Sequence, residues 1–417
     1  MSELKGKRLL LLGGHSLMRH VIEKARELGV YTIVTDYYPA EKSPSKAIAD
    51  EAYDVSTTDV DAIVKLAQDV HADGIFTGYV DVNLLPCSLA CERLGLPFYA
   101  TPDQIEHTIN KRKFKEMCRK HGIRVAEDIP KEIYTEKPEE INFPIIIKPA
   151  DSYSSKGISV CYEPKDIAPC IEHALDFSSA KEVVVERYIY GDDVYLYFTV
   201  KDGVLSLSAM ADRALNDEQK GYAPQPVGYS FPSKYIDKYY SEVHDKLQNM
   251  VSDLGLKNAT FFLQGFVEND SLIFFEMGLR LTGGAGYVQI RNQNEIDQVE
   301  MHITYALTGK FGKWDLLKYD NPRFKKPAFV LVVLLKEGKV AKINGLDEIK
   351  AMPETIDIVQ FIKEGAVNTG KGTLNQVMAR IYLYSDTKEK LDEAITKVKN
   401  TIEVIDDNGE NMILNMN

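Results

Sequence analysis

Residues 272–284, LIFFEMGLRLTGG, are the stretch that decides the fold of this chain. The first half is apolar and β-prone, and it follows a turn-like run, ENDS, at residues 268–271. The segment before that turn, ATFFLQGFV (residues 259–267), is also strand-like. The sequence therefore predicts a β-hairpin that carries two polar residues, Gln264 and Glu276, within apolar surroundings.

The polar residues of this stretch allow two interpretations. Burying the carboxylate of Glu276 is costly unless it is paired or bound to a cation. Arg280 follows four residues later, and a Thr-Gly-Gly turn comes next. Either the strand ends at a site for phosphate and metal, or Glu276 and Arg280 simply pair with each other. On this stretch alone the ion pair is the preferred interpretation, and the rest of the chain has to decide.

The composition is that of a soluble globular protein. The chain has 417 residues, 44% of them hydrophobic and 27% charged, which suffices for roughly two to four domain-sized units. The net charge of −12 argues against nucleic acid or an acidic membrane as a partner, because no basic excess exists to neutralise phosphates. Five scattered cysteines, no visible secretory signal and no apolar run of membrane-spanning length lead us to expect a cytoplasmic protein.

Residues 8–100 alternate strand and helix patterns, which predicts a parallel sheet wrapped by helices. Such a sheet binds ligands at the carboxyl ends of its strands. Gly13, Gly14, Asp36 and Asp81 lie there, but the full GxGxxG pattern is absent. A small-molecule pocket or a tight turn is therefore preferred over a dinucleotide site. The strands we expect are residues 8–12, 31–35, 74–77 and 96–99.

Two lysines mark a candidate phosphate site. Lys111 starts the helix expected over residues 111–121, where positive charge opposes the helix dipole and an anionic ligand would relieve the cost. An ordinary solvated basic face is the alternative. Lys148 ends an apolar strand and leads into DSYSSKG, residues 151–157, whose small residues let backbone N–H groups approach phosphate oxygens. Since the Walker pattern GxxxxGK[ST] is missing, we expect a hairpin that folds over the phosphates as a mobile flap.

The later part of the chain is interpreted from similar patterns. A strand over residues 182–189 precedes two more, and a Gly/Pro/Tyr-rich loop is expected at residues 213–232. Its length of about twenty residues suggests a function. A long helix over residues 233–254 leads to the opening hairpin, and residues 324–327 mark a boundary. Strands and a helix alternate after that boundary, which indicates a small α+β unit.

Taken in order, these motifs resemble the ATP-grasp superfamily. The order is a lysine at a helix start, an apolar strand with lysine and a small-residue flap, Glu-x-Tyr-Ile-x-Gly-x-acid, and paired acid and amide strands followed by arginine. The superfamily includes biotin carboxylase, carbamoyl-phosphate synthetase, purine-pathway carboxylate ligases and amino-acid ligases. The resemblance covers residues 5–310, and the C-terminal segment is similar to the last domain of the amino-acid-ligase branch.

The resemblance implies a mixed α/β and α+β fold of four units. An N-terminal parallel-sheet α/β domain (1–102) would precede an ATP-grasp fold made of two α+β subdomains. The first of these, 103–195, would carry the phosphate flap, and the second, 196–325, the metal site. A small C-terminal α+β domain (326–417) would follow.

The resemblance also implies a binding site for ATP with Mg²⁺ (or Mn²⁺). Glu186 would take the adenine amino group, and the backbone at Tyr188 or Ile189 would read the ring edge. Asp193 stands where the family has an acid for the ribose hydroxyls. The phosphates would be bound by Lys111, Lys148 and the flap residues Ser154, Ser155, Lys156 and Gly157.

The opening hairpin would supply the metal ligands and the catalytic arginine. Gln264 and Glu276 match the two metal-binding positions, and Arg280 matches the arginine that steadies the transferred phosphate or acyl phosphate. The family pattern Glu-x-Asn-x-Arg is broken by Gly278, which has no side-chain oxygen to donate. This leaves the number of metal ions open and keeps open a degenerate member without turnover. Other sources for the missing ligand are Asn292 and Asn294.

These implications predict an ATP-dependent ligase that activates a small carboxylate as an acyl phosphate and joins it to an amine. Alternatives are carbamoyl-phosphate- or carboxylase-type chemistry, an ATP-binding regulatory protein, and a dinucleotide-dependent oxidoreductase built on the N-terminal domain. We expect small-molecule carboxylate and amine substrates, and the resemblance leaves room for a homodimer. Candidate substrate-binding residues, for which ordinary surface positions are the alternative, are the carboxylate clamps Arg213 and Arg291 and the acceptor contacts Gly14 and His15.

Overall fold

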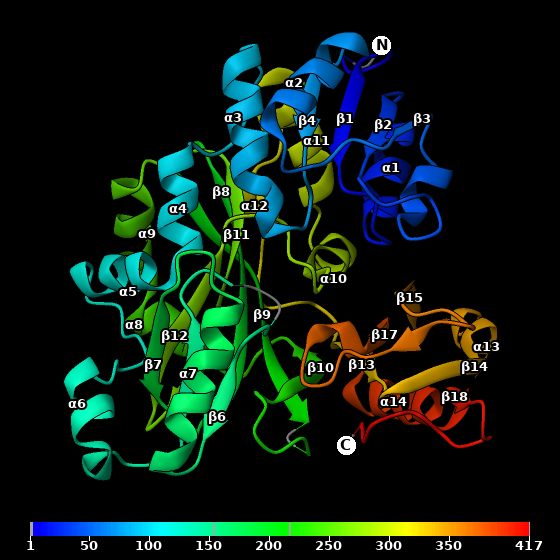
Figure 1. Cartoon of the computed structure of the whole chain (residues 1–417). Coiled ribbons are helices and arrows are strands. Elements are labelled where there is room, and N and C mark those ends of the chain that lie inside the picture. Colours follow the sequence, from blue (N-terminus) through cyan, green and yellow to red (C-terminus); the bar gives the residue numbers. More distant parts are fainter. Residues whose placement is uncertain (1–2, 153–154, 217, 417) are drawn as a thin grey trace.

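The computed structural model describes residues 3–152, 155–216 and 218–416. A parallel sheet near the N-terminus, a three-stranded sheet and an eight-stranded antiparallel sheet follow one another (Figure 1). A second three-stranded sheet lies near the C-terminus. The predicted mixture of α/β and α+β architecture is confirmed.

The hairpin predicted from the opening stretch is present. Strands β11 (Ala259–Glu268) and β12 (Ser271–Gly278) pair antiparallel, with Gln264 opposite Glu276. The register shifts immediately beside this pair, which is the mark of a β-bulge. Because of the bulge, the consecutive residues Phe275 and Glu276 both line the cavity described below.

The hairpin forms one edge of the eight-stranded sheet, whose order is β12-β11-β8-β9-β10-β13-β17-β15. The last three strands follow the boundary that we expected near residue 325, and β13 pairs directly with β10. The sheet is therefore continuous across that boundary, and the four-domain division remains a prediction. The strands added here are β8 (Asp192–Lys201), β9 (Val204–Asn216), β10 (Gln225–Phe231), β13 (Ala328–Leu334), β15 (Thr355–Gln360) and β17 (Val377–Tyr384).

The N-terminal sheet is parallel, with the order β3-β2-β1-β4. Leu9 and Leu11 pack with α1 and α11, whereas Leu10 and Leu12 pack with α2 and α3, so helices cover both faces (Figure 1). Helix α11 lies so close to β4 that a β-carbon on Gly74 would be 2.3 Å from the carbonyl oxygen of Ala306. The elements are β1 (Arg8–Leu12), β2 (Tyr31–Thr35), β3 (Glu51–Tyr53), β4 (Gly74–Phe76), α1 (Met18–Glu27), α2 (Val60–Asp69), α3 (Leu84–Leu94) and α11 (Gln298–Thr308).

One prediction for this sheet was wrong, and one short strand was missed. Residues 96–99 form no strand, because Pro97 has no backbone N–H to donate to a neighbouring strand. The short edge strand β3 was not predicted, since three residues are too few to show an alternating pattern.

Two further predictions, in the middle of the chain, need correction. The expected loop at 213–232 is mostly strand: β9 runs to Asn216 and β10 begins at Gln225. Pro226 is accommodated at a bulge in the β9–β10 pairing, where a missing N–H is tolerated. The expected long helix at 233–254 is two helices, α8 (Ile236–Glu242) and α9 (His244–Asp253).

The three-stranded sheet β6-β5-β7 lies on the other side of the cavity from the eight-stranded sheet. Helix α7 packs against β5, and α5 packs against α4 and β12. The strands of this sheet are β5 (Ile145–Pro149), β6 (Ser159–Cys161) and β7 (Val183–Arg187). The helices in this part of the chain are α4 (Pro102–Ile109), α5 (Lys111–Lys120), α6 (Lys131–Glu136) and α7 (Ile167–Asp176). The remaining elements are α10 (Gly286–Gln293), α12 (Leu316–Tyr319), β14 (Gly338–Asn344), α13 (Leu346–Lys350), β16 (Val367–Asn368), α14 (Lys388–Thr401) and β18 (Glu403–Asp406).

In the described part of the chain, every helix is too short or too polar to traverse a bilayer.

Candidate active site

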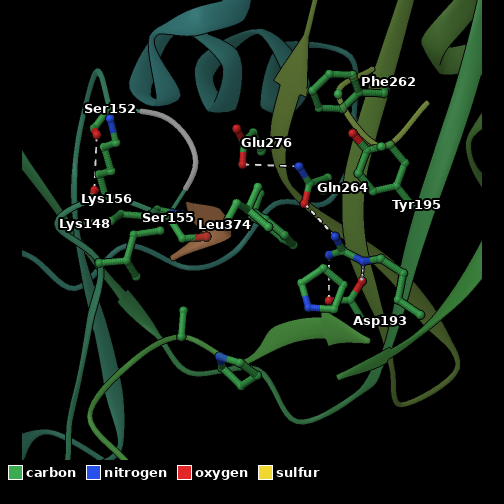
Figure 2. A pocket seen from close by; sticks show the side chains of 18 of the residues that line it. Lys148, Ser152, Ser155, Lys156, Asp193, Tyr195, Phe262, Gln264, Glu276 and Leu374 are labelled. Carbon is green, nitrogen blue, oxygen red and sulfur yellow. Dashed lines mark hydrogen bonds and ion pairs between the residues drawn. The ribbon is translucent and has the colours of Figure 1, made fainter. Parts of the chain in front are cut away.

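A cavity of about 750 Å³ lies between the eight-stranded sheet and the three-stranded sheet. Alternate residues of β11 face it, namely Phe262, Gln264 and Phe266. Lys148 faces it from β5, on the opposite side (Figure 2). Of the residues predicted for the site, the cavity is lined by His15, Lys111, Lys148, Ser155, Lys156, Glu186, Tyr188, Ile189, Asp193, Arg213, Gln264, Glu276 and Arg280.

The two predicted phosphate lysines are both buried, and both line this cavity. The ammonium of Lys148 lies 2.6 Å from Oε2 of Glu186, which places it in an ion pair. The ammonium of Lys111 donates to the carbonyl oxygen of Ser152, at 2.6 Å, at the base of the flap. Burial lowers the pKa of Lys111, and the nearby Glu276 carboxylate partly offsets this. An anion that enters the cavity would therefore meet two ammonium groups.

Glu186 has a second partner that the sequence analysis missed. Its Oε1 atom lies 2.6 Å from the ammonium of Lys115, and only 2% of Glu186 is exposed. Lys115 follows Lys111 by four residues in α5, so the two side chains lie on the same helical face. That spacing is a signal from which Lys115 could have been found. The proposed contact between Glu186 and adenine remains a prediction.

The flap is described only in part, because Ser154 lies outside the described residues. Ser155 and Lys156 line the cavity, and the hydroxyl of Ser152 donates to the carbonyl oxygen of Lys156 at 3.2 Å (Figure 2). Gly157 has φ +74°, and a β-carbon there would lie 2.8 Å from Cγ of Pro149. A glycine is therefore required where the chain turns out of the flap.

Asp193 and Arg213 form a buried ion pair on the floor of the cavity. The guanidinium is bidentate to the carboxylate, with distances of 2.5 Å from Nε to Oδ1 and 2.8 Å from Nη2 to Oδ2. Burial alone would lower the pKa of Arg213, but the Asp193 carboxylate more than offsets this and raises it. Nη1 of Arg213 donates to Oε1 of Gln264 at 3.1 Å. Arg213 thus fixes two predicted nucleotide-site residues, and its role as a substrate clamp remains a prediction.

The simple pairing of Glu276 with Arg280 is not what the structure shows. Arg280 is bidentate to Asp81 of the N-terminal domain, with 2.6 Å from Nε to Oδ1 and 2.5 Å from Nη2 to Oδ2. Burial would lower the pKa of Arg280, and Asp81 reverses this. Glu276 instead accepts a hydrogen bond from Nε2 of Gln264, at 3.5 Å (Figure 2). Arg280 therefore joins the hairpin to the N-terminal sheet.

The N- and C-terminal parts of the chain also contribute residues to the cavity lining. Burial lowers the pKa of His15 to about 4, so its imidazole is neutral at pH 7. Nε2 of His15 is buried and finds no hydrogen-bond partner among the described residues. Arg380 of β17, which the sequence analysis missed, is 6% exposed and donates from Nη1 to the carbonyl oxygen of Gly283 at 2.6 Å. Its Nε has no partner within the described chain.

Two of the predicted substrate residues lie outside the cavity lining. The backbone N–H of Gly14 donates to Asp36 at 3.0 Å, and a β-carbon on Gly14 would lie 2.1 Å from Oγ of Ser43. Gly14 therefore supports the turn beside His15. Arg291 is exposed on α10 and is not among the described residues that line the cavity.

The donor set suits a magnesium ion that is shared with a phosphate. Within the described ranges no cluster of three His, Cys, Asp or Glu side chains could hold a metal unaided. Mg²⁺ commonly takes one or two carboxylates and completes its shell with substrate phosphates and water. Glu276 lines the cavity close to Lys111 and fits that requirement.

Comparisons with known proteins agree with this geometry. Residues 106–259 match the family described as D-ala D-ala ligase C-terminus. The chain is 24% identical over 353 residues to a formate-dependent phosphoribosylglycinamide formyltransferase of Prochlorococcus marinus, covering 82% of this chain and 85% of that protein.

Solved structures share the fold over nearly the whole length. The L-amino acid ligase of Bacillus licheniformis matches with a TM-score of 0.78 and 16% identity, covering 96% of this chain and 99% of that one. The biotin carboxylase domain of Hydrogenobacter thermophilus 2-oxoglutarate carboxylase, solved with MgADP and bicarbonate, matches with a TM-score of 0.77 and 16% identity. The match covers 97% of this chain and 91% of that domain.

The two sheets and the lysine-lined cavity between them define an ATP-grasp fold. The chain has the fold of these solved ATP-grasp structures, and residues 106–259 match the D-ala D-ala ligase C-terminus family.

Proposed function

We propose that this chain is an ATP-dependent ligase that activates a small carboxylate as an acyl phosphate and joins it to an amine. One observation carries the proposal: the two lysines and the described flap residues line the same cavity as Arg280, His15 and Arg380. A nucleotide whose phosphates contact the lysines would share this cavity with a substrate held by the three other residues. Such an arrangement brings two reactants together and excludes water.

The nucleotide half has an apolar and a cationic part. Ile189, Phe266 and Phe275 offer apolar surface for a base, next to the backbone of Tyr188. Lys111 and Lys148 offer ammonium groups for phosphate oxygens, which carry most of the charge in phosphoryl transfer. A Mg²⁺ ion on Glu276 would bridge phosphate oxygens and offset their charge. These roles of Lys111, Lys148, Ser155, Lys156, Gly157, Glu186 and Asp193 remain our proposal.

The substrate half suits a carboxylate. Arg380 lines the cavity with a buried guanidinium, and the planar fork of arginine matches a carboxylate. Arg280 lines the same cavity and would supply positive charge to a transferred phosphoryl group. A carboxylate oxygen would attack the γ-phosphorus as ADP leaves. The amine nitrogen would then attack the acyl carbon, lose a proton and release phosphate.

The names of the relatives support these substrate classes. One is a formate-dependent formyltransferase and another an L-amino acid ligase. Arg213 and Arg291 remain candidate carboxylate clamps and His15 a candidate acceptor contact. A homodimer is supported by one structural relative that was solved as a domain dimer, and light scattering on the purified chain would test it.

The decisive experiment measures ADP release with a panel of small carboxylates and amines in all pairs. A ligase requires ADP release that depends on both substrates and equals the amount of amide formed. ATP binding without any substrate-stimulated ADP would instead indicate a regulatory protein. ADP release that depends on bicarbonate alone would indicate carboxylase- or carbamoyl-phosphate-type chemistry, and a thermal shift with NAD(P) but not ATP would indicate an oxidoreductase.

A further inference from the structure

The cavity is lined by four carboxylates, and they are not equivalent. Asp81 pairs with Arg280 and Asp193 with Arg213. Glu186 pairs with Lys148 and Lys115. Glu276 forms no ion pair with any described residue. It is therefore the carboxylate with charge left for a cation.

The amide of Gln264, the other expected metal position, is oriented by its two neighbours. Arg213 has only donors, and its Nη1 lies 3.1 Å from Oε1 of Gln264. Glu276 has only acceptors when ionised, and its Oε2 lies 3.5 Å from Nε2 of Gln264. Turning the amide to offer its oxygen beside Glu276 would set an NH₂ group against the buried guanidinium. The amide therefore presents N–H groups, and no oxygen, on the side of Glu276.

The third expected position is closed by an aromatic ring. Phe262 stands opposite Gly278 in the β11–β12 pairing. A β-carbon at residue 278 would lie 2.2 Å from Cζ of Phe262. The ring is held by Tyr195, with centroids 5.1 Å apart, and by the guanidinium of Arg280 at 5.1 Å from the ring centroid. No side chain at 278 can reach the cavity while this ring is in place.

We propose that the nucleotide site holds a single divalent ion, bound by Glu276, and that Gln264 positions Glu276 by a hydrogen bond and is not a metal ligand. The inference rests on the nucleotide binding of the proposed function. The ammonium of Lys111 donates to the Ser152 carbonyl oxygen and lies close to Glu276. Its positive charge takes the place of the charge that a second ion would supply. The ion keeps the remaining positions of its shell for phosphate oxygens and water.

The test counts ions directly. Mn²⁺ replaces Mg²⁺, and electron paramagnetic resonance measures free Mn²⁺ during titration of equimolar protein and the β,γ-imido analogue of ATP. We expect one Mn²⁺ per bound nucleotide analogue. Glu276→Gln removes the ligand itself and should weaken Mn²⁺ binding by more than about 100-fold, whereas Gln264→Met removes only the hydrogen bond that orients Glu276 and should weaken it by about 10- to 100-fold. Glu163→Gln, at an exposed ion pair with Lys165, is the control for loss of a carboxylate.

Two results would overturn the inference: two Mn²⁺ ions per nucleotide analogue in the unaltered protein, or a loss of affinity in Gln264→Met as large as in Glu276→Gln. The ion count needs no variant, so the proposal stays testable if Gln264→Met fails to fold. Bound analogue with two ions would leave the proposed function intact. Absence of analogue binding would overturn the proposed function and the inference together.

Discussion

The ring of Phe262 lies over the α-carbon of Gly278, its partner on the neighbouring strand. An added β-carbon would lie 2.2 Å from Cζ and 2.4 Å from Cε1 of the ring. Side chains on paired strands normally stand beside one another on one face of the sheet. Here the aromatic ring takes the space of both, which explains why the glycine stands where the family pattern has asparagine.

Gly278→Ala should therefore destabilise the fold. Forcing an extra carbon into a packed core costs about 1–3 kcal/mol, and we expect a loss of that size in the free energy of unfolding. Urea denaturation checks it. The matched control is Gly283→Ala in the turn that follows, because a β-carbon there has no atom within 4 Å. Equal stability of the two variants would contradict the packing of Phe262 described above.

Arg213→Met should be more costly, because it leaves the Asp193 carboxylate buried without a partner. Breaking such a pair typically costs about 3–5 kcal/mol. Arg323→Met removes an exposed ion pair with Asp237 and should cost less than about 1 kcal/mol. If urea denaturation gave similar losses for both variants, the Asp193–Arg213 pair would not be the buried anchor that its distances indicate.

His302 should make stability depend on pH. Burial lowers the pKa of its imidazole from 6.5 to about 3, and Nε2 lies 2.8 Å from the hydroxyl of Thr260. The unfolded chain takes up a proton below pH 6.5 and the folded chain does not, so this contribution is complete above pH 6.5 and is lost as the pH falls toward 3. Between pH 7 and 5 the loss should be about 2 kcal/mol.

The replacement His302→Phe isolates that contribution. It keeps an aromatic ring beside Phe76, which stacks on His302 at a centroid distance of 5.4 Å, and removes the titration. We expect its free energy of unfolding to fall less between pH 7 and 5 than that of the unaltered protein. Other groups titrate equally in both proteins, so the difference in pH dependence between them belongs to His302. Parallel pH curves would show that His302 is not buried as a neutral base.

The parts of the fold that sequence could predict are those set by local patterns. The hairpin of β11 and β12 follows from apolar strands around a polar turn, and Lys111 and Lys148 follow from their places at a helix start and a strand end. The strand β10 was mistaken for loop because its Gly and Pro disfavour strands locally. Pairing with β9 and β13 on its two sides overrides that preference.

The partners of the site residues could not be predicted in the same way. Arg280 and Asp81 are 199 residues apart, and Arg380 reaches Gly283 across 97 residues. No periodicity links such positions, because each contact depends on how separate sheets are packed. The nearby alternative, Glu276 with Arg280, was plausible from spacing alone. The choice of Asp81 instead depends on the N-terminal sheet lying beside the hairpin.

Lys148→Met should lower turnover by at least about 100-fold in whichever substrate pair releases ADP, because electrostatic groups that act on the transition state commonly contribute that much. The variant should remain stable, because Glu186 keeps Lys115 as a partner at 2.6 Å. We expect a folded protein by circular dichroism. Lys165→Ala, at an exposed position in the same region, should leave turnover unchanged. Full activity of Lys148→Met would show that Lys148 does not act on the phosphates.

Arg380→Met should act on the carboxylate and not on ATP. Arg380 lines the cavity, and its Nη1 is held by the Gly283 carbonyl oxygen. Loss of a charged hydrogen-bond donor to a carboxylate should raise KM for that substrate by about 10- to 100-fold, with the Kd for the ATP analogue unchanged. Arg380→Lys keeps the charge without the planar fork and should lie between Arg380→Met and the unaltered protein. If the Kd for the ATP analogue rose as much as KM, Arg380 would be needed for the shape of the cavity and would not contact the carboxylate.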